Sequence, residues 1–389
     1  MEEINKIPKI RFKNYNSNWK TYKVGDLLCE RNEKTVKSDE YPLMAFIANE
    51  GVAPKGKRYD RSSLVTNTNT KLYKKTEYGD FIYSSNNLET GSIGLNKYGK
   101  ACISPVYSIF YNTNLSDSSF IGHRLVMRDF IHEMVKWRQG VIYGHWKIHE
   151  SDFAKIDIMV PKVDEQIKIG QFLDQIDKLI DIHQNKYEKL LKLKKSLTYK
   201  VFPQNKENIP HLRFKNYSKP WFATEFNQIF NYERPDKYIV KSSKYNNNAL
   251  TPVLTANKSF ILGYTDEKNT YKETNESIIF DDFTLDSKYV DFPYMVKSSA
   301  IKILTLKNNT INNLKFNYEL LNNTKFNVIG HARHYISIVQ PKSVYTTYKD
   351  EQDKISELFS KIDDLIELHH SKCEKLIFLK KGITNNIFI

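Results

Sequence analysis

One short stretch carries the residue types of a phosphate-binding loop. Residues 51–58 (GVAPKGKR) have the glycine and lysine spacing of a P-loop. However, Arg58 stands where that loop needs a Ser or Thr hydroxyl for magnesium, Pro54 lies inside it, and the residues after Arg58 lack a helical pattern. Two interpretations remain, a solvated loop and a basic loop that meets phosphates. The basic residues would be Lys55, Lys57, Arg58 and Arg61.

Carboxylates next to a lysine are the second candidate for chemistry. Asp281, Asp282, Asp286 and Lys288 loosely resemble a nuclease metal site, but no second carboxylate adjoins the lysine. A turn residue, or an acceptor for a cytosine amino group, is the favoured interpretation. Residues 327–334 (NVIGHARH) contain two histidines without a cysteine or carboxylate at ligand spacing, so we expect no zinc there.

Sequence signatures of a methyltransferase do not occur either. The chain has no Asn-Pro-Pro-Tyr-like tetrad and no Gly-rich loop that comes after a strand to bind a methyl donor. We therefore predict no catalytic residue, no metal site and no cofactor held by this chain.

Composition narrows the class of partner. Lys and Arg number 59 against 45 Asp and Glu among 389 residues, a net charge of +14. This excess favours a polyanion, and nucleic acid comes before a membrane because no basic amphipathic stretch stands out. The three cysteines form neither a zinc spacing nor a disulfide framework. With no apolar leader and no membrane-spanning stretch, we expect a soluble cytoplasmic protein.

An internal repeat positions these residues. The opening motif PKIRFKNY at residues 8–15 recurs as PHLRFKNY at 210–217, and Trp19 and Trp221 come after it at the same offset of 202. Downstream, residues 165–202 align without gaps on residues 351–388 at an offset of 186, with 18 of 38 positions identical. Between the motifs, roughly 20–160 and 222–345 show little similarity beyond Gly144-His145 and Gly330-His331. The pattern predicts a common scaffold that carries two different reading domains.

The two repeated downstream segments, 165–202 and 351–388, are predicted to form long helices. Apolar residues recur in steps of three and four over about five heptads, which is typical of a coiled-coil seam. Some 35 residues at about 1.5 Å each give a rod of about 50 Å. We expect the two rods to pair antiparallel. The predicted seam is Ile169, Phe172, Ile176, Leu179, His183, Lys186, Leu190, Leu193 and Leu197, with Ile355, Leu358, Ile362, Leu365, His369, Lys372, Leu376, Leu379 and Ile383 in the same slots.

Histidine and lysine interrupt both stripes midway, at His183 and Lys186 and at His369 and Lys372. A polar layer that fixes the register of the pairing is the favoured interpretation. Metal binding and a notch for a partner are the alternatives.

The divergent segments, roughly 20–160 and 222–345, are predicted to have a mixed α/β fold. Apolar, β-branched or aromatic runs predict strands at 43–48, 80–84, 102–111, 278–280 and 301–306, and 130–138 predicts a short helix. The fold class is therefore α+β: two mixed reading domains and two long helices, with internal pseudo-twofold symmetry. We place the domains at 1–160 and 203–345, and the helical segments at 161–202 and 346–389.

Polar and basic loop residues are the candidates for DNA contact, since Arg and Lys serve guanine or phosphate and Asn serves adenine. For each, an ordinary surface role is the alternative. Besides the four basic residues of the P-loop-like stretch, the candidates in the first domain are Asn86, Asn87, Lys97, His145, Trp146 and Lys147. Those in the second are Asn257, Lys258, Thr284, Lys288, His331 and Arg333.

The repeat resembles the specificity subunit of type I restriction–modification systems. The resemblance rests on the opening motif ending in Trp, on PKVDEQ at 161–166 and on KDEQ at 349–352. GDFIYS at 79–84 with SPVY at 104–107, and IIFDD at 278–282 with YVDF at 289–292, look like two types of target-recognition domain. One departure is the insertion between Lys342 and Lys349, which obscures the exit from the second domain.

That resemblance implies a non-catalytic subunit that binds double-stranded DNA. Each recognition domain would read one half of a split site, and the helices would set the gap. Two methyltransferase subunits would dock on the scaffold and restriction subunits would join through the complex. S-adenosylmethionine, ATP and Mg²⁺ would be bound by those partners. Readers held about one DNA turn apart, near 34–36 Å, fit this division, and two unlike readers predict an asymmetric site.

Three other classes compete with this function. An enzyme with a fused methyltransferase or nuclease domain is disfavoured because no spare region of about 200 residues exists. A stand-alone DNA-binding regulator is the main alternative, and a purely structural coiled-coil protein is another. Co-purification separates them, because a specificity subunit should bring down a methyltransferase.

Overall fold

The computed structural model describes residues 7–54, 70–140, 146–204, 207–246, 248–257, 259–271, 276–327, 330 and 332–389. The chain forms two compact units. Unit 1 comprises Met1–His183 and Ser371–Ile389, and unit 2 comprises Gln184–His370. Each unit therefore contains part of both long helices, α5 (Val163–Val201) and α8 (Lys349–Ile387). None of the helices in the described residues is long and apolar enough to cross a membrane.

A four-stranded antiparallel sheet forms the centre of unit 1. Its strand order is β2 (Leu28–Glu30), β10 (Ser108–Asn112), β7 (Phe81–Tyr83) and β8 (Ile93–Leu95). Smaller sheets pair β1 (Lys20–Lys23) with β13 (Asp157–Val160), β6 (Tyr73–Thr76) with β3 (Lys34–Thr35) and β9 (Ala101–Ile103), β4 (Ala45–Ile47) with β5 (Gly51–Ala53), and β11 (Gln139–Gly140) with β12 (Trp146–Lys147). The short helices are α1 (Val24–Leu27), α2 (Ser118–Arg124), α3 (Arg128–Lys136) and α4 (Glu150–Phe153).

Unit 2 repeats this topology although its sequence differs. The central antiparallel sheet has the order β15 (Phe230–Glu233), β21 (Ile301–Leu306), β18 (Ser277–Asp281) and β19 (Ser287–Val290). β14 (Phe222–Glu225) pairs with β22 (Ser343–Thr346), and β16 (Thr251–Leu254) lies between β17 (Ile261–Thr265) and β20 (Met295–Val296). The helices are α6 (Phe226–Ile229), α7 (Leu314–Asn323), the 3₁₀ turn η4 (Asp236–Tyr238) and the π-helical turn η5 (Tyr335–Val339).

Most predicted elements of the reading domains are found, with one difference. The run at 102–111 forms two strands, β9 and β10, because a turn interrupts it at Pro105. Proline lacks a backbone N–H and fits the first corner of a turn, so a single strand cannot pass through this position.

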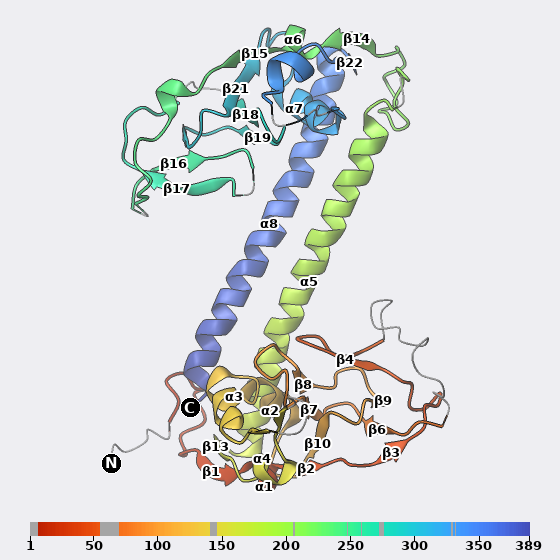
Figure 1. Ribbon diagram of the computed structural model, residues 1–389, viewed down its shortest axis with the longest axis vertical. Helices are drawn as coiled ribbons and strands as arrows, with labels where there is room; N and C mark the ends of the chain where they lie inside the picture. Colours follow the sequence, from red (N-terminus) through yellow and green to blue (C-terminus); the bar gives the residue numbers. More distant parts are fainter. Residues whose placement is uncertain are drawn as a thin grey trace. The chain divides into compact units, whose positions relative to one another are not determined.

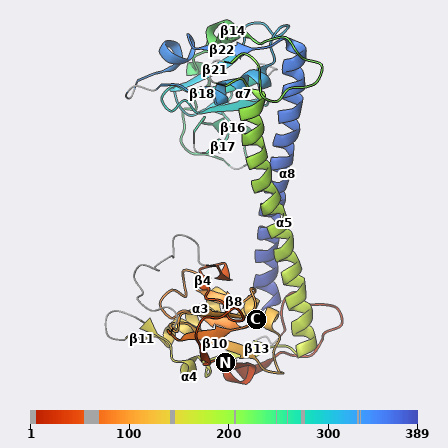
Figure 2. The same ribbon diagram turned by 90° about the vertical axis from the view of Figure 1, so that its right-hand side faces the viewer.

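The long helices pair antiparallel within each unit (Figures 1 and 2). In unit 1, Lys380 of α8 forms an ion pair with Asp177 of α5. In unit 2 the matched pair is Lys194 of α5 with Asp363 of α8, at 2.7 Å. Early residues of one helix thus meet late residues of the other in both units. The predicted antiparallel pairing is confirmed.

The predicted seam was wrong at three positions of each helix, where the side chains are exposed: Leu179, Lys186 and Leu193 of α5, and Leu365, Lys372 and Leu379 of α8. Exposure shows that Leu179 and Leu193 are 45% and 47% exposed, whereas Ile180 and Lys194 are not exposed. α5 is apolar at both neighbouring positions in several turns, for example Phe172 with Leu173, so steps of three and four fit two registers. The residues at the repeating seam positions, none of them exposed, are Ile169, Leu173, Ile176, Ile180, His183, Tyr187, Leu190, Lys194, Leu197 and Val201 on α5, and Ile355, Phe359, Ile362, Ile366, His369, Cys373, Leu376, Lys380, Ile383 and Ile387 on α8.

This register also divides the predicted polar layer. His183 and His369 occupy seam positions and are half-buried, while Lys186 and Lys372 are exposed. Only the histidines therefore stand where a polar layer could act on pairing.

The tryptophan after each opening motif fixes the reading domain to a helix end. Trp19 is buried and packs against Phe120 of α2, which in turn contacts Phe388 just beyond α8, with ring centroids 5.9 and 5.4 Å apart. In unit 2 the same three-ring arrangement is made by Trp221, Phe316 and Phe202. The matched frame thus holds each variable domain by the same contacts.

Candidate nucleic-acid interface

A repeated Glu-Gln pair fastens each reading domain to the start of its long helix. In unit 1 the carboxylate of Glu165 accepts two hydrogen bonds from Arg11, both at 2.8 Å. The side chain of Gln166 accepts from the backbone N–H of Asp117 at 3.0 Å and donates to the carbonyl of Leu115 at 3.1 Å. Asp117 caps α2. This pair therefore ties the opening motif and α2 to one turn of α5.

Unit 2 forms the same links with different distances. Glu351 accepts from Arg213 at 2.7 and 2.8 Å, and Gln352 accepts from the backbone N–H of Asn313 at 2.8 Å. Asn313 caps α7 as Asp117 caps α2. The start of α2 in unit 1 and the start of α7 in unit 2 are consequently held on equivalent supports.

In unit 1 the loop between β7 and β8 forms hydrogen bonds with residues 146–148, which lie far along the chain. The side-chain oxygen of Asn86 accepts from the backbone N–H of Trp146 at 2.6 Å, and Ser85 accepts from the N–H of Ile148 at 3.0 Å. Asn86 and Asn87 are exposed, and Trp146 is 50% exposed. The structure thus brings together three of the predicted contact residues at one edge.

Sequence reasoning missed Arg138, which braces this loop. Its guanidinium donates to the carbonyl of Ser85 at 3.0 Å and to Glu89 at 2.9 Å. Its position at the end of a predicted helix gave no signal, because the contact is long-range. Lys147 is half-buried and forms an ion pair with Glu150 at 2.7 Å.

In unit 2 the β18–β19 loop is a turn built on the acidic pair. Asp281 accepts from the backbone N–H groups of Phe283 and Thr284, both at 2.9 Å. Asp282 is buried, forms an ion pair with the buried Lys302 at 3.1 Å and accepts from the backbone of Tyr335 at 2.7 Å. Of the two interpretations left open by the sequence, the turn residue is confirmed for Asp281.

The turn carries Thr284 and lies beside Arg333. The guanidinium of Arg333 lies over the ring of Phe283, 5.8 Å from its centroid, and both of these side chains are exposed. Asp282 joins the two segments through its contact with the backbone of Tyr335. Phe283 is a member of this edge that the sequence did not single out.

The other described candidates lie apart from these two edges. Lys97 is exposed and forms an ion pair with Asp174 of α5 at 3.5 Å. Lys288 is half-buried on β19, and Asn257 accepts from the Thr255 hydroxyl at 2.9 Å between β16 and β17. Seven candidates lie outside the described residues and stay predictions: Lys55, Lys57, Arg58, Arg61, His145, Lys258 and His331.

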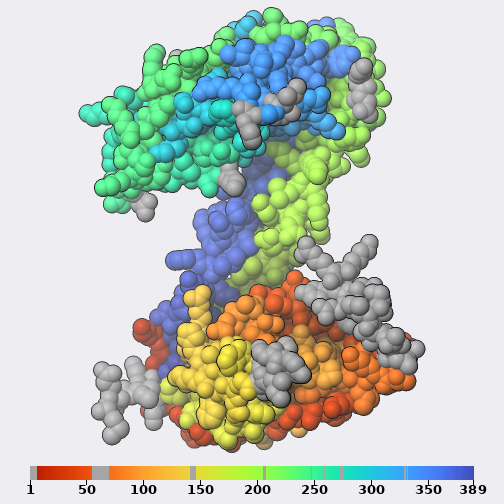
Figure 3. All heavy atoms as spheres, in the orientation of Figure 1, coloured from red at the N-terminus to blue at the C-terminus, as the bar shows by residue number. Residues whose placement is uncertain are grey.

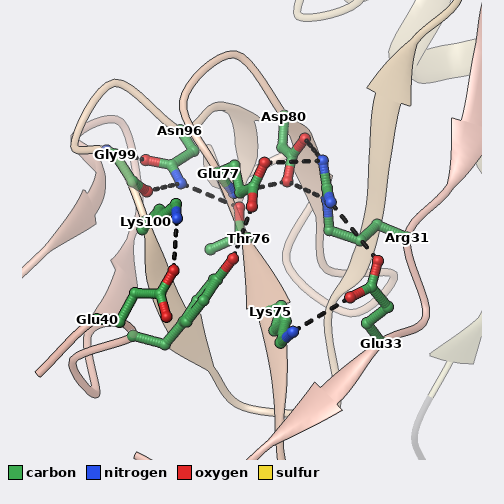
Figure 4. A network of polar contacts seen from close by, with 11 residues as sticks. Arg31, Glu33, Glu40, Lys75, Thr76, Glu77, Asp80, Asn96, Gly99 and Lys100 are labelled. Atoms are coloured by element: carbon green, nitrogen blue, oxygen red, sulfur yellow. Dashed lines mark hydrogen bonds and ion pairs between the residues drawn. The ribbon is translucent and has the colours of Figure 1, made fainter. Parts of the chain in front are cut away.

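A polar network supports β7 from the opposite end of the strand (Figure 4). Arg31, which comes directly after β2, donates two hydrogen bonds to Asp80, at 2.8 and 3.1 Å. Burial raises the pKa of Asp80, and the hydrogen bonds from Arg31 oppose that rise. Asn96 donates to Thr76 at 3.0 Å and to the Gly99 carbonyl at 2.7 Å. These side chains therefore stabilise the hairpin that β7 and β8 form.

His123, Asp174 and Asp177 are the one group in the described residues with the spacing of a metal site. Both carboxylates already have side-chain partners: Lys97 and His123 contact Asp174, and Lys380 forms an ion pair with Asp177. Burial alone would raise the pKa of Asp174, but hydrogen bonds from His123 and Ser119 bring it below its ordinary value. The group therefore acts as a link between α2 and α5.

Comparison with known proteins finds relatives that share parts of this sequence and its fold. Residues 16–192 match the type I restriction modification DNA specificity domain. A relative in Escherichia coli, the type I restriction enzyme EcoR124I/EcoR124II specificity subunit, is 38% identical over 144 residues, which is 36% of each chain. The aligned part thus spans about a third of that relative's length.

The likeness in fold extends further. The crystal structure of a type-I restriction-modification system S subunit from M. genitalium has a TM-score of 0.70 and 14% identity, and the match covers 98% of this chain and 99% of that one. At this identity the likeness concerns the fold. Together these findings show that residues 16–192 carry the type I restriction modification DNA specificity domain and that the chain as a whole has the fold of that S subunit.

Proposed function

We propose that this chain is the DNA-reading subunit of a type I restriction–modification complex, in which each unit reads one half of a split, asymmetric site. One observation carries the proposal. Both units have the same four-stranded sheet order and the same Glu-Gln support, yet they present unlike loops at the same place. A shared frame with different exposed side chains suits two different sequences.

The chemistry of the two edges supports direct readout. Asn86 and Asn87 in unit 1 carry amide groups that suit adenine, while Arg333 in unit 2 offers a donor fork that suits guanine. Trp146, whose backbone N–H donates to Asn86, and Phe283, whose ring lies under Arg333, carry exposed rings that can pack on a sugar or a thymine methyl. The net charge of +14 provides attraction to phosphates. The subunit itself has no catalytic part in this proposal.

Replacing Arg333 with alanine is expected to relax recognition of one half-site only. A good bidentate contact to a base contributes about 1–3 kcal/mol of discrimination. Methylation in cells that carry the Arg333→Ala variant should therefore spread to sites altered in one half, while the other half stays strict. An unchanged methylation pattern would remove Arg333 from the readers. Arg128, on α3 of unit 1, is a suitable control for the loss of one arginine.

The partners we propose are two methyltransferase subunits on the helices, with restriction subunits joining through the complex. S-adenosylmethionine, ATP and Mg²⁺ would be bound by those subunits. Parts of both helices reach the surface (Figure 3). Several exposed apolar residues on them recur at the repeat offset of 186. We define the helix row as Leu179, Ile182 and Leu193 of α5 with their counterparts Leu365, Leu368 and Leu379 of α8.

The matched helix row favours this proposal over a stand-alone regulator. Each unit holds one complete set: Leu179, Ile182 and Leu379 in unit 1, and the counterparts Leu365, Leu368 and Leu193 in unit 2. Exposed apolar groups that recur in two units fit two copies of the same partner. A regulator that acts alone has no use for such a surface.

Replacing Leu179 with aspartate should release the partner from unit 1, and Leu365→Asp should release it from unit 2. A charge at the centre of an apolar contact weakens binding by about tenfold or more. Mass measurement of complexes with the methyltransferase subunit should give one bound copy for each single variant. Asn185→Asp, on the exposed face of α5, is the control and should retain both. Two copies bound to the Leu179→Asp variant would contradict the assignment.

A further inference from the structure

The opening motif of unit 2 borders an apolar pocket. Its volume is about 160 Å³. One wall is the start of α8 and the other is the opening motif itself, with the ion pair of Arg213 and Glu351 at the side. The apolar lining consists of Val201, Pro210, Leu212, Phe214, Ile355 and Leu358.

The equivalent position in unit 1 shows which kind of side chain fits the unit 2 pocket. Phe172 of unit 1 corresponds to Leu358, and Phe12 corresponds to Phe214. The ring of Phe172 meets the ring of Phe12 edge-on, with centroids 5.8 Å apart and planes at 85°. In unit 2 leucine replaces that ring, and Phe214 is left 39% exposed. Unit 1 thus supplies an internal template for an aromatic ring against the phenylalanine of the opening motif.

The size of the pocket agrees with that template. A dry cavity of about 150 Å³ lined by Leu, Ile and Phe binds benzene. A ring in the unit 2 pocket could pair edge-on with Phe214, an arrangement that contributes beyond burial of area alone. The wall residue Val201 is also smaller than its counterpart Ile387, which adds room.

We propose that this pocket receives an aromatic side chain from the partner polypeptide that lies along α8. The proposal rests on the proposed function. Leu358 and Leu365 are one heptad apart, so they share a face of α8. Leu365 belongs to the helix row, and the proposed partner surface therefore leads directly to the pocket.

Charged residues around the pocket indicate which side chains of the partner lie next to its aromatic ring. Next to it lies an open hollow lined by Phe214 and Leu358 together with Lys215, Lys354, Lys361 and Glu357. Three lysines against one glutamate favour acidic residues beside the aromatic side chain of the partner. Because Phe172 occupies the matching place in unit 1, the ring contact distinguishes the two partner copies on an otherwise repeated scaffold.

The pocket can be tested on the full chain with fluorobenzene, observed by ¹⁹F NMR. Wild-type protein should bind the probe saturably at one site. Leu358→Phe should abolish binding because the new ring fills the pocket, whereas Leu250→Phe, the same change at a position 91% exposed, should leave it unaltered. Phe172→Leu should create a second site. Absence of saturable binding, or binding that survives Leu358→Phe, overturns the pocket.

The occupant is tested by adding the methyltransferase subunit of the proposed complex. Complex formation should displace fluorobenzene, and Leu358→Phe should weaken attachment of one partner copy by about tenfold. Fluorobenzene retained in the complex overturns the aromatic occupant while the pocket stands. Failure of the wild-type chain to bind the subunit at all overturns the proposed function, and the occupant with it, yet leaves the probe result intact.

Discussion

Replacing Arg213 with alanine lowers the free energy of unfolding of unit 2 by about 3–5 kcal/mol, which is expected when one partner of a buried ion pair is removed. The side chain of Glu351 is 1% exposed, and both of its oxygens accept from Arg213. Without the arginine, the one side-chain donor left to it among the described residues is the Thr347 hydroxyl, at 2.5 Å. Calorimetry of the full chain, with hydrogen exchange to assign the transition to unit 2, measures the loss.

Two further variants separate charge burial from simple truncation. Lys215→Ala, an exposed neighbour in the same motif, should change stability by about 0.5 kcal/mol or less. Combining Arg213→Met with Glu351→Leu should recover much of the loss, because no buried charge then remains. The explanation fails if Arg213→Ala costs no more than Lys215→Ala.

A chain of residues 203–389 alone is expected to form a homodimer. Unit 2 needs the end of α5, because Val201 and Phe202 belong to its core and Lys194 pairs with Glu319, whose side chain is 5% exposed. The end of α8 can supply matched residues from a second copy. Ile387, Phe388 and Lys380 stand at the offset of 186 from those three residues.

Sedimentation or light scattering of this half chain should give the mass of two copies. Phe388→Ala should shift it to monomer with loss of structure, since Phe388 would take the place of Phe202 between Trp221 and Phe316. Two identical readers related by a twofold axis should also recognise a symmetric site. A folded monomer at micromolar concentration would show that α5 is not required for unit 2.

The sequence predicted the frame well because the frame is a repeat. Heptad spacing located the two helices, and the paired Glu-Gln residues marked where each begins. The seam was wrong at Leu179 because Leu179 and Ile180 are both apolar, and spacing alone cannot choose between them. The pairing partner makes that choice.

The two groups of candidate DNA-contact residues, at the β7–β8 and β18–β19 loops, were harder to predict. That both domains share one strand order could not be seen, since the inserts have little sequence in common and strand pairing depends on long-range contacts. Arg138 and Phe283 were missed for the same reason, because their partners lie tens of residues away in sequence. Asn86, Trp146, Thr284 and Arg333 were chosen by residue type, and the structure groups them in two pairs.

Sequencing of DNA methylation in cells with and without this gene tests the central claim most directly. We predict that deletion removes methylation at one motif made of two unlike parts and a fixed spacer, and that the wild-type gene restores it. Exchange of residues 203–345 for those of a related chain should then change one part and leave the other. An unchanged set of methylated motifs after deletion would contradict the account.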